Sequence, residues 1–209
     1  MIVLGLTGSI GMGKSTAAAL LRRLGIPVHD ADAVVHRLQA KGGAAVAAIA
    51  AAFPGGVKEG RVDRQALGRI VFADKAALKK LEAILHPLVR REEQKFLAQA
   101  RARRRGLVAL DIPLLFETHA EQRCDHVMVV SAPRYVQLGR VLRRPGMTRE
   151  RLAGIEARQL PDIVKRVRAD TVIDTGLGRR HSLQAIRRTV RLLRKRRANA
   201  CRRDSDCED

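Results

Sequence analysis

Eight residues near the amino terminus combine glycines, a lysine and a serine at a spacing that suits phosphate binding. The run Gly8-Ser9-Ile10-Gly11-Met12-Gly13-Lys14-Ser15 satisfies the pattern G-x-x-x-x-G-K-[ST] in full. Glycines let the backbone turn tightly, so that successive N–H groups can point inward at an anion. Lys14 would place its charge on the β- and γ-phosphates, and the Ser15 hydroxyl could ligate Mg²⁺. The pattern predicts binding of a nucleoside triphosphate.

The segments on either side of this loop have the periodicity that such a site requires. Residues 2–6 form a short apolar run typical of a buried strand, and residues 15–24 have apolar positions at helical spacing. A helix that begins at the loop would present the positive end of its dipole to the phosphate. The residues expected to contact the nucleotide are Gly8, Gly11, Met12, Gly13, Lys14, Ser15 and Thr16.

Two aspartates follow a second short strand, which opens at residues 26–28 and ends at Asp30 and Asp32. The carboxyl ends of parallel strands face the ligand in an open α/β sheet. A carboxylate there could take the proton from an acceptor hydroxyl as the hydroxyl attacks phosphorus. If the backbone is extended, the two side chains point the same way, so one could be the base and the other could support Mg²⁺ or the next helix. Either could instead only cap that helix.

A third aspartate, Asp111, ends the apolar strand at residues 107–110. Asp111 has the position of the Walker-B carboxylate of P-loop enzymes, which could hold Mg²⁺ through water. The alternative is that Asp111 only begins a loop.

Arginines after Pro133 could stabilise the charge that builds on the transferred phosphoryl group. Arg140 and Arg144 would lie one helical turn apart on one face, directly before Pro145 and Gly146, which suits a mobile lid. The alternative is a solvated basic helix face. An Asn-Lys-x-Asp guanine-recognition motif does not occur, which argues against a GTPase, and the chain is too short for a second NTPase core, which argues against a helicase.

Composition supports an α/β protein with an anionic ligand. Of 209 residues, 46% are hydrophobic and only 2% aromatic, so the core must consist of Leu, Ile, Val and Ala, which suits a parallel sheet covered by helices. The net charge of +20 favours nucleic acid, an acidic membrane surface or small phosphorylated molecules, although solvated arginines would also produce it. No apolar stretch is long enough to span a membrane. The three cysteines have no metal-site or disulfide pattern, so we expect a cytoplasmic protein with reduced thiols.

The predicted fold is a P-loop NTPase domain over residues 2–197, with three α/β/α layers and a parallel five-stranded sheet. Its nucleotide-binding core comprises residues 2–35 and 106–197, and residues 36–100 form a helical insertion that needs no strand. Asp63 should cap a helix within this insertion. A helical lid covers about residues 134–165, broken at Pro145-Gly146. The last helix has apolar positions at helical spacing, and residues 198–209 should form a disordered polar tail.

The later motifs make the chain resemble the dephospho-coenzyme A kinase family. The loop and Asp30-Ala31-Asp32 are similar to the first two family signatures, of which the loop is generic. The more specific matches, in chain order, are Leu81-Glu82-x-Ile84-Leu85-His86-Pro87-Leu88, Asp111-Ile112-Pro113-Leu114-Leu115-Phe116-Glu117, Gln159-Leu160-Pro161 and Ala169-Asp170-x-Val172-Ile173-Asp174. The resemblance covers roughly residues 2 to 195.

This resemblance implies transfer of the ATP γ-phosphate to the ribose 3′-hydroxyl of dephospho-coenzyme A with Mg²⁺, giving coenzyme A and ADP, the final step of coenzyme A biosynthesis. By position, Asp32 resembles the carboxylate that activates the acceptor, with Lys14 and Ser15 as phosphate and metal contacts. Arg140 and Arg144 resemble the lid arginines.

The helical insertion looks like the family's coenzyme A-side domain, with Arg64 and His86 as candidate substrate contacts. His86 could equally be a buried histidine at a helix end. Two departures stand out: Ile155 occupies a position where many relatives carry an arginine, and Ser9 a position where glycine is common.

Two alternatives remain open at this point. A nucleoside or nucleotide kinase of other specificity would share the loop, lid and base, but not the His86-Pro87 and Pro113-Leu114-Leu115 signatures. A nucleic-acid-binding P-loop protein would explain the charge, yet the chain has few aromatic side chains for base stacking. We expect ATP and Mg²⁺ as cofactors and dephospho-coenzyme A as the small-molecule partner, with no obligate nucleic acid and no membrane. The sequence leaves the oligomeric state open, and we favour a monomer.

Overall fold

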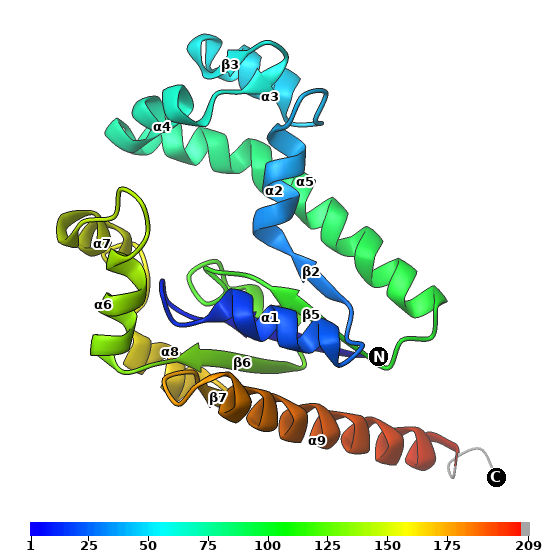
Figure 1. Ribbon diagram of the computed structural model, residues 1–209. Helices are drawn as coiled ribbons and strands as arrows, with labels where there is room; N and C mark the ends of the chain where they lie inside the picture. Colours follow the sequence, from blue (N-terminus) through cyan, green and yellow to red (C-terminus); the bar gives the residue numbers. More distant parts are fainter. Residues whose placement is uncertain (206–209) are drawn as a thin grey trace. The chain divides into compact units, whose positions relative to one another are not determined.

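The chain forms two compact units. A computed structural model describes residues 1–205, except for the side chains of residues 72, 73 and 200–205 (Figure 1). Unit 1 comprises Met1–His29 together with Ala100–Asp209, and unit 2 comprises Asp30–Gln99. The predicted insertion, residues 36–100, falls almost entirely within unit 2.

Unit 1 is built on a five-stranded sheet with the order β2-β5-β1-β6-β7. The strands are β1 (Ile2–Thr7), β2 (Val28–Asp30), β5 (Leu107–Asp111), β6 (His126–Ser131) and β7 (Thr171–Asp174). Strand β1 pairs in parallel with β5 and β6, and β6 pairs in parallel with β7. All five predicted strands are present, and the predicted α/β fold with its parallel five-stranded sheet is confirmed.

Two helices cover one face of this sheet, α1 (Lys14–Arg23) and α9 (Arg179–Ser205). Alternate strand residues point toward them, as the period of two in a strand requires. Figure 1 shows α9 running alongside β7. The buried cluster contains Leu4, Leu6, Ala17, Leu20, Leu21, Leu107, Ala109, Met128, Val130, Ile173, Ile186, Val190 and Leu193. Apart from methionines it consists of Leu, Ile, Val and Ala, as the scarcity of aromatic residues predicted.

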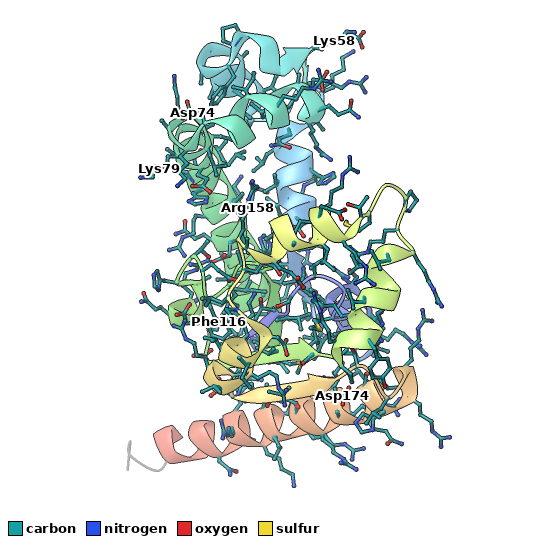
Figure 2. The ribbon with its side chains drawn as sticks, turned by 90° about the vertical axis from the view of Figure 1, so that its left-hand side faces the viewer. Lys58, Asp74, Lys79, Phe116, Arg158 and Asp174 are labelled. Carbon is teal, nitrogen blue, oxygen red and sulfur yellow. The ribbon has the colours of Figure 1, made fainter. Side chains whose placement is uncertain are left out.

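The opposite face is covered by residues 112–124, including the short helix η2 (Ala120–Arg123), and by α8 (Asp162–Arg168). Gly5 lies against this layer, because a Cβ there would come within 2.8 Å of the Cys124 sulfur and of a Leu115 methyl. Phe116, marked in Figure 2, is buried, with the Arg168 guanidinium 4.9 Å from its ring centroid. The domain therefore has three layers.

The predicted lid region consists of three short helices rather than two. Helix α6 spans Arg134–Leu142, α7 spans Arg149–Glu156, and α8 follows Pro161. The predicted break at Pro145-Gly146 is present, but a second break precedes α8, because Pro161 lacks the N–H that a continuous helix would need. Arg144 lies beyond the end of α6, so the prediction that Arg140 and Arg144 share one helical face is wrong.

Unit 2 is mainly helical, with α2 (Ala31–Gln39), α3 (Val46–Ala52), η1 (Pro54–Gly56), α4 (Arg64–Ala73) and α5 (Lys75–Ala102), whose last residues belong to unit 1. Helix α5 continues through Pro87. Asp63 caps α4 by accepting from the N–H groups of Gln65 and Ala66, which confirms its predicted capping role. The buried core of this unit contains Val34, Leu38, Ala45, Ile49, Phe53, Val62, Leu67, Val71 and Leu81.

Unit 2 also contains a small hairpin that the sequence pattern did not predict. Strands β3 (Val57–Lys58) and β4 (Arg61–Val62) pair antiparallel, so the prediction of no strand in this region is wrong. The two turn residues, Glu59 and Gly60, both have positive φ, as the favoured two-residue hairpin turn requires. Strands of two residues are too short to show a recognisable alternation.

Helix α9 continues to Ser205, which corrects the prediction that a disordered tail begins at residue 198. Alanine and arginine favour the helix, and neither glycine nor proline interrupts the segment. Residues 206–209 of the predicted tail lie outside the described residues. Among the helices described for residues 1–205, none is long and apolar enough to cross a membrane.

A buried histidine makes stability depend on pH. His126, at the start of β6, is buried and has Nε2 2.8 Å from the Thr171 hydroxyl. Burial lowers the pKa of His126 below its ordinary value, and Arg196 acts in the same direction, whereas Asp170 opposes it. The unfolded chain, in which a histidine has a pKa of about 6.5, therefore binds the proton more readily than the fold does.

We predict that the free energy of unfolding falls as the pH is lowered through the unfolded pKa of His126, because protonation then favours the unfolded state. Urea unfolding at pH 8 and pH 5.5 measures this loss. The loss should be smaller in His126→Gln and unchanged in His181→Gln, which alters an exposed histidine of α9. An equal loss in both variants would contradict the assignment.

Candidate functional site

Four strand ends of unit 1 meet at one edge of the sheet. In the parallel register, Leu6 pairs with Asp111, Thr7 with Val129, and Ser131 with Asp174. Strand β1 leads into the glycine-rich loop, β5 ends at Asp111, and β7 leads into Thr175. The loop therefore lies at the centre of the edge where ligands of open α/β sheets bind.

The loop conformation requires its glycines. A Cβ on Gly8 would lie 2.5 Å from a Val130 methyl and 2.6 Å from the Val130 carbonyl oxygen. Gly11 and Gly13 have φ values of +78° and +92°, which side chains disfavour. A side chain at Gly11 would also clash, because its Cβ would lie 2.5 Å from a Val141 methyl. Ser9, the departure from the family pattern, is accommodated here as a buried residue.

The amino end of α1 is available to an anion. The helix begins at Lys14, and no described side chain caps its first turn. The free N–H groups and the dipole of such an end favour a phosphate. Gly13, whose carbonyl oxygen accepts from the Ala17 N–H at 3.1 Å, joins the loop to the helix.

Lys14 and Asp111 form an ion pair inside the site. The Lys14 ammonium donates to an Asp111 carboxylate oxygen at 2.7 Å, and Asp111 is almost fully buried. The sheet register places these two residues together, because β5 is the direct neighbour of β1. Of the two predictions for Asp111, a functional carboxylate or a simple loop start, this contact favours the first.

The oxygen donors at this edge suit Mg²⁺. Ser15 is exposed in the first turn of α1, and Asp111 ends the neighbouring strand. Mg²⁺ prefers hard oxygen ligands and is usually held by one or two protein groups together with substrate phosphates. Within the described residues there is no cluster of three or more His, Cys, Asp or Glu side chains that could hold a metal without such phosphates.

Three successive carbonyl oxygens of the loop accept hydrogen bonds from outside it. Gln137 donates to the Ile10 oxygen at 2.9 Å, Arg140 to the Gly11 oxygen at 3.3 Å, and the Thr175 hydroxyl to the Met12 oxygen at 2.7 Å. These contacts hold the carbonyl groups outward. Because N–H groups oppose carbonyl groups along a chain, this arrangement favours the phosphate-binding conformation.

Arg140 contacts the loop from α6. Besides Gly11, its guanidinium donates to the Thr175 hydroxyl at 2.9 Å and to the Thr175 carbonyl oxygen at 2.7 Å. This geometry makes Arg140 a residue that positions the loop. Arg144 is exposed in the turn after α6. Their predicted contacts with the transferred phosphate stay predictions.

The segment between α7 and α8 is fixed to the loop and to the sheet. The Ile10 N–H donates to the Gln159 side-chain oxygen at 3.1 Å, and the Leu160 N–H donates to Glu117 at 2.8 Å. Glu117 also forms a 2.8 Å ion pair with Lys165, whose side chain is completely buried. Gln159 and Glu117 both stand in family signatures, but the residues alone did not show what they contact.

A second hydrogen-bonded group holds α6 to α7. Gln137 is buried and donates to Glu156 at 3.1 Å, and Arg134 forms an ion pair with the same carboxylate. Hydrogen bonding to Glu156 raises the pKa of Arg134 above its ordinary value. A cavity of about 480 Å³ next to the loop is lined by Ser9, Met12, Arg134, Gln137, Gln159 and Asp162, among others.

The two aspartates after β2 have different surroundings. Asp30 caps α2, accepting from the Ala33 N–H at 3.0 Å. Asp32 is exposed in the first turn of that helix. The two carboxylates were expected to point the same way only if the backbone were extended, and this condition is not met, because α2 begins at Ala31 between them. The capping alternative applies to Asp30.

In unit 2, Arg64 lies at the edge of a basic pocket. Its guanidinium contacts the Gln39 side-chain oxygen at 3.3 Å and His36 Nε2 at 2.9 Å. The pocket has a volume of about 610 Å³, and Lys41, Lys58 and Arg61 contribute further positive charge. His86 is exposed in the middle of α5, so the alternative of a buried histidine at a helix end is wrong.

A glycine-rich loop between a central parallel strand and a helix, with its lysine paired to the carboxylate of the next strand, defines a P-loop NTPase domain. The sequence model of the dephospho-CoA kinase family matches residues 2–178. The chain belongs to the dephospho-CoA kinase family, and it is accordingly an ATP-using phosphotransferase with an alcohol acceptor.

Individual relatives agree with this membership. The chain is 69% identical to a dephospho-CoA kinase of Paramagnetospirillum magneticum over 79% of this chain and 78% of that protein. It is similar to a crystal structure from Thermus thermophilus, named TT1252, with 42% identity and a TM-score of 0.80 over 90% of this chain and 95% of the other. For a dephospho-CoA kinase from Campylobacter jejuni the identity is 25% and the TM-score 0.69, covering 92% and 97%.

We predict that Glu117→Gln lowers the free energy of unfolding by about 3 kcal/mol, because it leaves the Lys165 charge buried without its partner. Urea unfolding measures the change. Glu92→Gln is the control: Glu92 pairs with Lys95 and Arg37, whose side chains are 61% and 66% exposed, so a loss of only about 1 kcal/mol is expected. Equal losses would show that the buried pair contributes no more than a surface pair.

Proposed function

We propose that the chain transfers the γ-phosphate of ATP to the ribose 3′-hydroxyl of dephospho-coenzyme A, producing coenzyme A and ADP. The observation that carries this proposal is the family match across residues 2–178, which includes the loop and the Lys14–Asp111 pair. In the reaction a bond forms between the 3′-oxygen and the γ-phosphorus. The bond from that phosphorus to the bridging oxygen breaks, and ADP retains the electron pair.

The loop and Lys14 would bind the phosphates of ATP. Three outward carbonyl contacts favour inward N–H groups, and Lys14 lies at the first residue of α1. Lys14 would exchange part of its contact with Asp111 for the β- and γ-phosphates. This would stabilise the negative charge that shifts toward ADP as the bond breaks.

Ser15 and Asp111 would hold Mg²⁺, the hydroxyl directly and the carboxylate through water. Bound Mg²⁺ would neutralise phosphate charge and fix the orientation of the γ-phosphate. The near-complete burial of Asp111 supports this role, because a buried carboxylate is stabilised by a nearby cation.

Asp32 would accept the proton of the 3′-hydroxyl as that oxygen attacks. Its place directly after β2 and its exposed position in the first turn of α2 support this role. Asp30 is already used as the helix cap, which leaves Asp32 as the better candidate of the pair. Arg140 and Arg144 would contribute positive charge near the transferred group.

The basic pocket of unit 2 would contact the acceptor. Dephospho-coenzyme A carries a diphosphate, and Arg64, Lys41, Lys58 and Arg61 supply charge that suits it. His86 remains a second candidate contact from α5. The cytoplasmic location, the monomeric state and the independence from nucleic acid are part of the same proposal.

One assay tests the proposed acceptor. The protein is incubated with Mg-ATP and dephospho-coenzyme A, and the product is examined for a 3′-phosphate. Adenosine and AMP are tested alongside. Preference for either of these would favour a nucleoside or nucleotide kinase and overturn the proposal.

We predict that Asp32→Asn keeps ATP affinity and loses at least a hundredfold in kcat, because a general base typically contributes a factor of about 10² to 10⁴. The matched control is Asp30→Asn, which preserves a good helix cap and should retain turnover. ATP binding is measured by calorimetry and turnover by ADP release. Full turnover in Asp32→Asn would remove this residue from the role of base.

We predict that Arg64→Ala raises the KM for dephospho-coenzyme A by about tenfold, as expected when one charge-assisted hydrogen bond is lost. The KM for ATP should stay within about twofold. Lys79→Ala removes the same charge from unit 2, and Figure 2 shows Lys79 on the opposite side of that unit from Lys58. Equal changes in both variants would mean that the overall charge matters and the pocket does not.

A further inference from the structure

A second strongly basic pocket lies in unit 1, away from the glycine-rich loop. It has a volume of about 520 Å³, and five arginines line it together with short apolar residues. Three of them follow α5 and two lie in the carboxy-terminal half of α9; they are Arg103, Arg104, Arg105, Arg194 and Arg197. Two segments that are far apart in the sequence therefore bring their positive charge to one concave surface.

This pocket is at the amino-terminal edge of the sheet. Gly106 and Leu107 line it, and the Ile2 N–H donates to the Gly106 oxygen at 2.9 Å, so the starts of β1 and β5 lie beside it. The loop that binds ATP follows the other end of β1, a strand of six residues that spans about 20 Å. The two sites are therefore separate, and one ligand of nucleotide size cannot fill both.

The five guanidinium groups have no described counter-charge. Among the residues whose side chains are described, none of the five forms an ion pair with a carboxylate. Arginine keeps its charge at every physiological pH, so the cluster cannot reduce its repulsion by losing protons. An anion bound in the pocket would offset that repulsion.

Arg104 occupies a backbone position that favours glycine. Helix α5 ends in a Schellman motif, in which the Arg105 N–H donates to the Ala100 oxygen at 2.9 Å and the Arg104 N–H donates to the Arg101 oxygen at 2.8 Å. Arg104 is the left-handed residue of this motif, with φ of +51°. Glycine is the usual residue at such a position, because a side chain there is strained. A strained residue with a charged side chain in a pocket indicates that the side chain has a function.

Arg197 is fitted closely against the same loop. A Cβ on Gly106 would overlap the Arg197 guanidinium, so the absence of a side chain at this position lets the arginine of α9 reach the backbone before β5. Close packing of this kind limits the freedom of a long side chain and places its donors in advance of binding.

We propose that this pocket binds a small anion that carries several phosphate groups. Guanidinium groups form paired hydrogen bonds with phosphate oxygens, and a cluster of five suits two or more phosphates. The volume lies in the range of small-ligand sites. None of the described lining residues is aromatic, so the phosphates would be recognised and an attached base would not be stacked.

Inorganic tripolyphosphate is the probe that tests this site. Calorimetric titration is carried out with Mg²⁺ in excess and with a non-hydrolysable ATP analogue at saturation, so that the glycine-rich loop is occupied. The wild-type protein should still bind tripolyphosphate. Absence of binding under these conditions would overturn the proposal.

A matched pair of variants locates the binding. Arg194→Ala/Arg197→Ala should weaken tripolyphosphate binding at least tenfold. Arg187→Ala/Arg188→Ala removes the same charge from exposed positions of the same helix and should change the affinity by less than twofold. Equal weakening in both pairs would mean that tripolyphosphate responds only to the net charge, and would overturn the proposal.

Arg104→Gly separates binding from stability. Glycine relieves the backbone strain at this position, so the midpoint of thermal unfolding should stay the same or rise, while tripolyphosphate affinity should fall at least fivefold. Unchanged affinity would show that Arg104 is only a helix end.

A single-stranded RNA of twelve nucleotides distinguishes a small anion from a nucleic-acid backbone. For the proposed site, tripolyphosphate should bind in 150 mM salt, and it should compete with any RNA that binds. RNA binding that is lost equally in both double variants, without tripolyphosphate binding, would assign the basic face of α9 to nucleic acid and overturn the small-anion proposal.

Discussion

The direction of the loop carbonyl groups is the constraint on which the site depends. If the N–H groups of the loop are to face a phosphate, the carbonyl oxygens of the same peptide groups point the opposite way and must find donors on the other side. Gln137, Arg140 and Thr175 supply those donors for three consecutive residues. Two of the donors come from α6 and one follows β7, so the lid region and the last strand are both needed to form the loop. This gives α6 a structural task besides any contact with substrate.

Two buried ion pairs also fix elements around the site. Lys14 with Asp111 joins α1 to β5, and Lys165 with Glu117 joins α8 to the segment after β5. Buried pairs contribute little net stability, because desolvation opposes the attraction, but breaking one leaves a costly charge. Each pair joins two elements of unit 1 at one fixed contact. Glu117 also accepts a hydrogen bond from the Leu160 N–H. This contact fixes the backbone next to Gln159, whose side chain accepts from the loop.

Left-handed backbone occurs in this chain for two different reasons. At Gly11 a side chain is excluded both by the positive φ and by contact with Val141, so only glycine fits. Arg104 adopts a similar φ beside a pocket, where there is room for its side chain. The first case is a packing requirement that a short motif already shows. In the sequence, Arg104 looks like any other arginine of a basic run, and only the structure shows that it ends a helix with positive φ.

The sequence by itself determined the five strands, the phosphate loop and the family, because these depend on local patterns: aliphatic runs, glycine spacing and ordered signatures. It also indicated Asp63 as a cap. The family resemblance pointed to Asp32 as the base, but the residues did not show which of Asp30 and Asp32 caps a helix, since that depends on where α2 begins. The hairpin of two-residue strands was not predicted. Only the tertiary structure decided which side chains meet. Gln137, Thr175 and Lys165 contact residues 48 to 163 positions away, and such pairs follow from strand order and helix packing, which local periodicity does not encode.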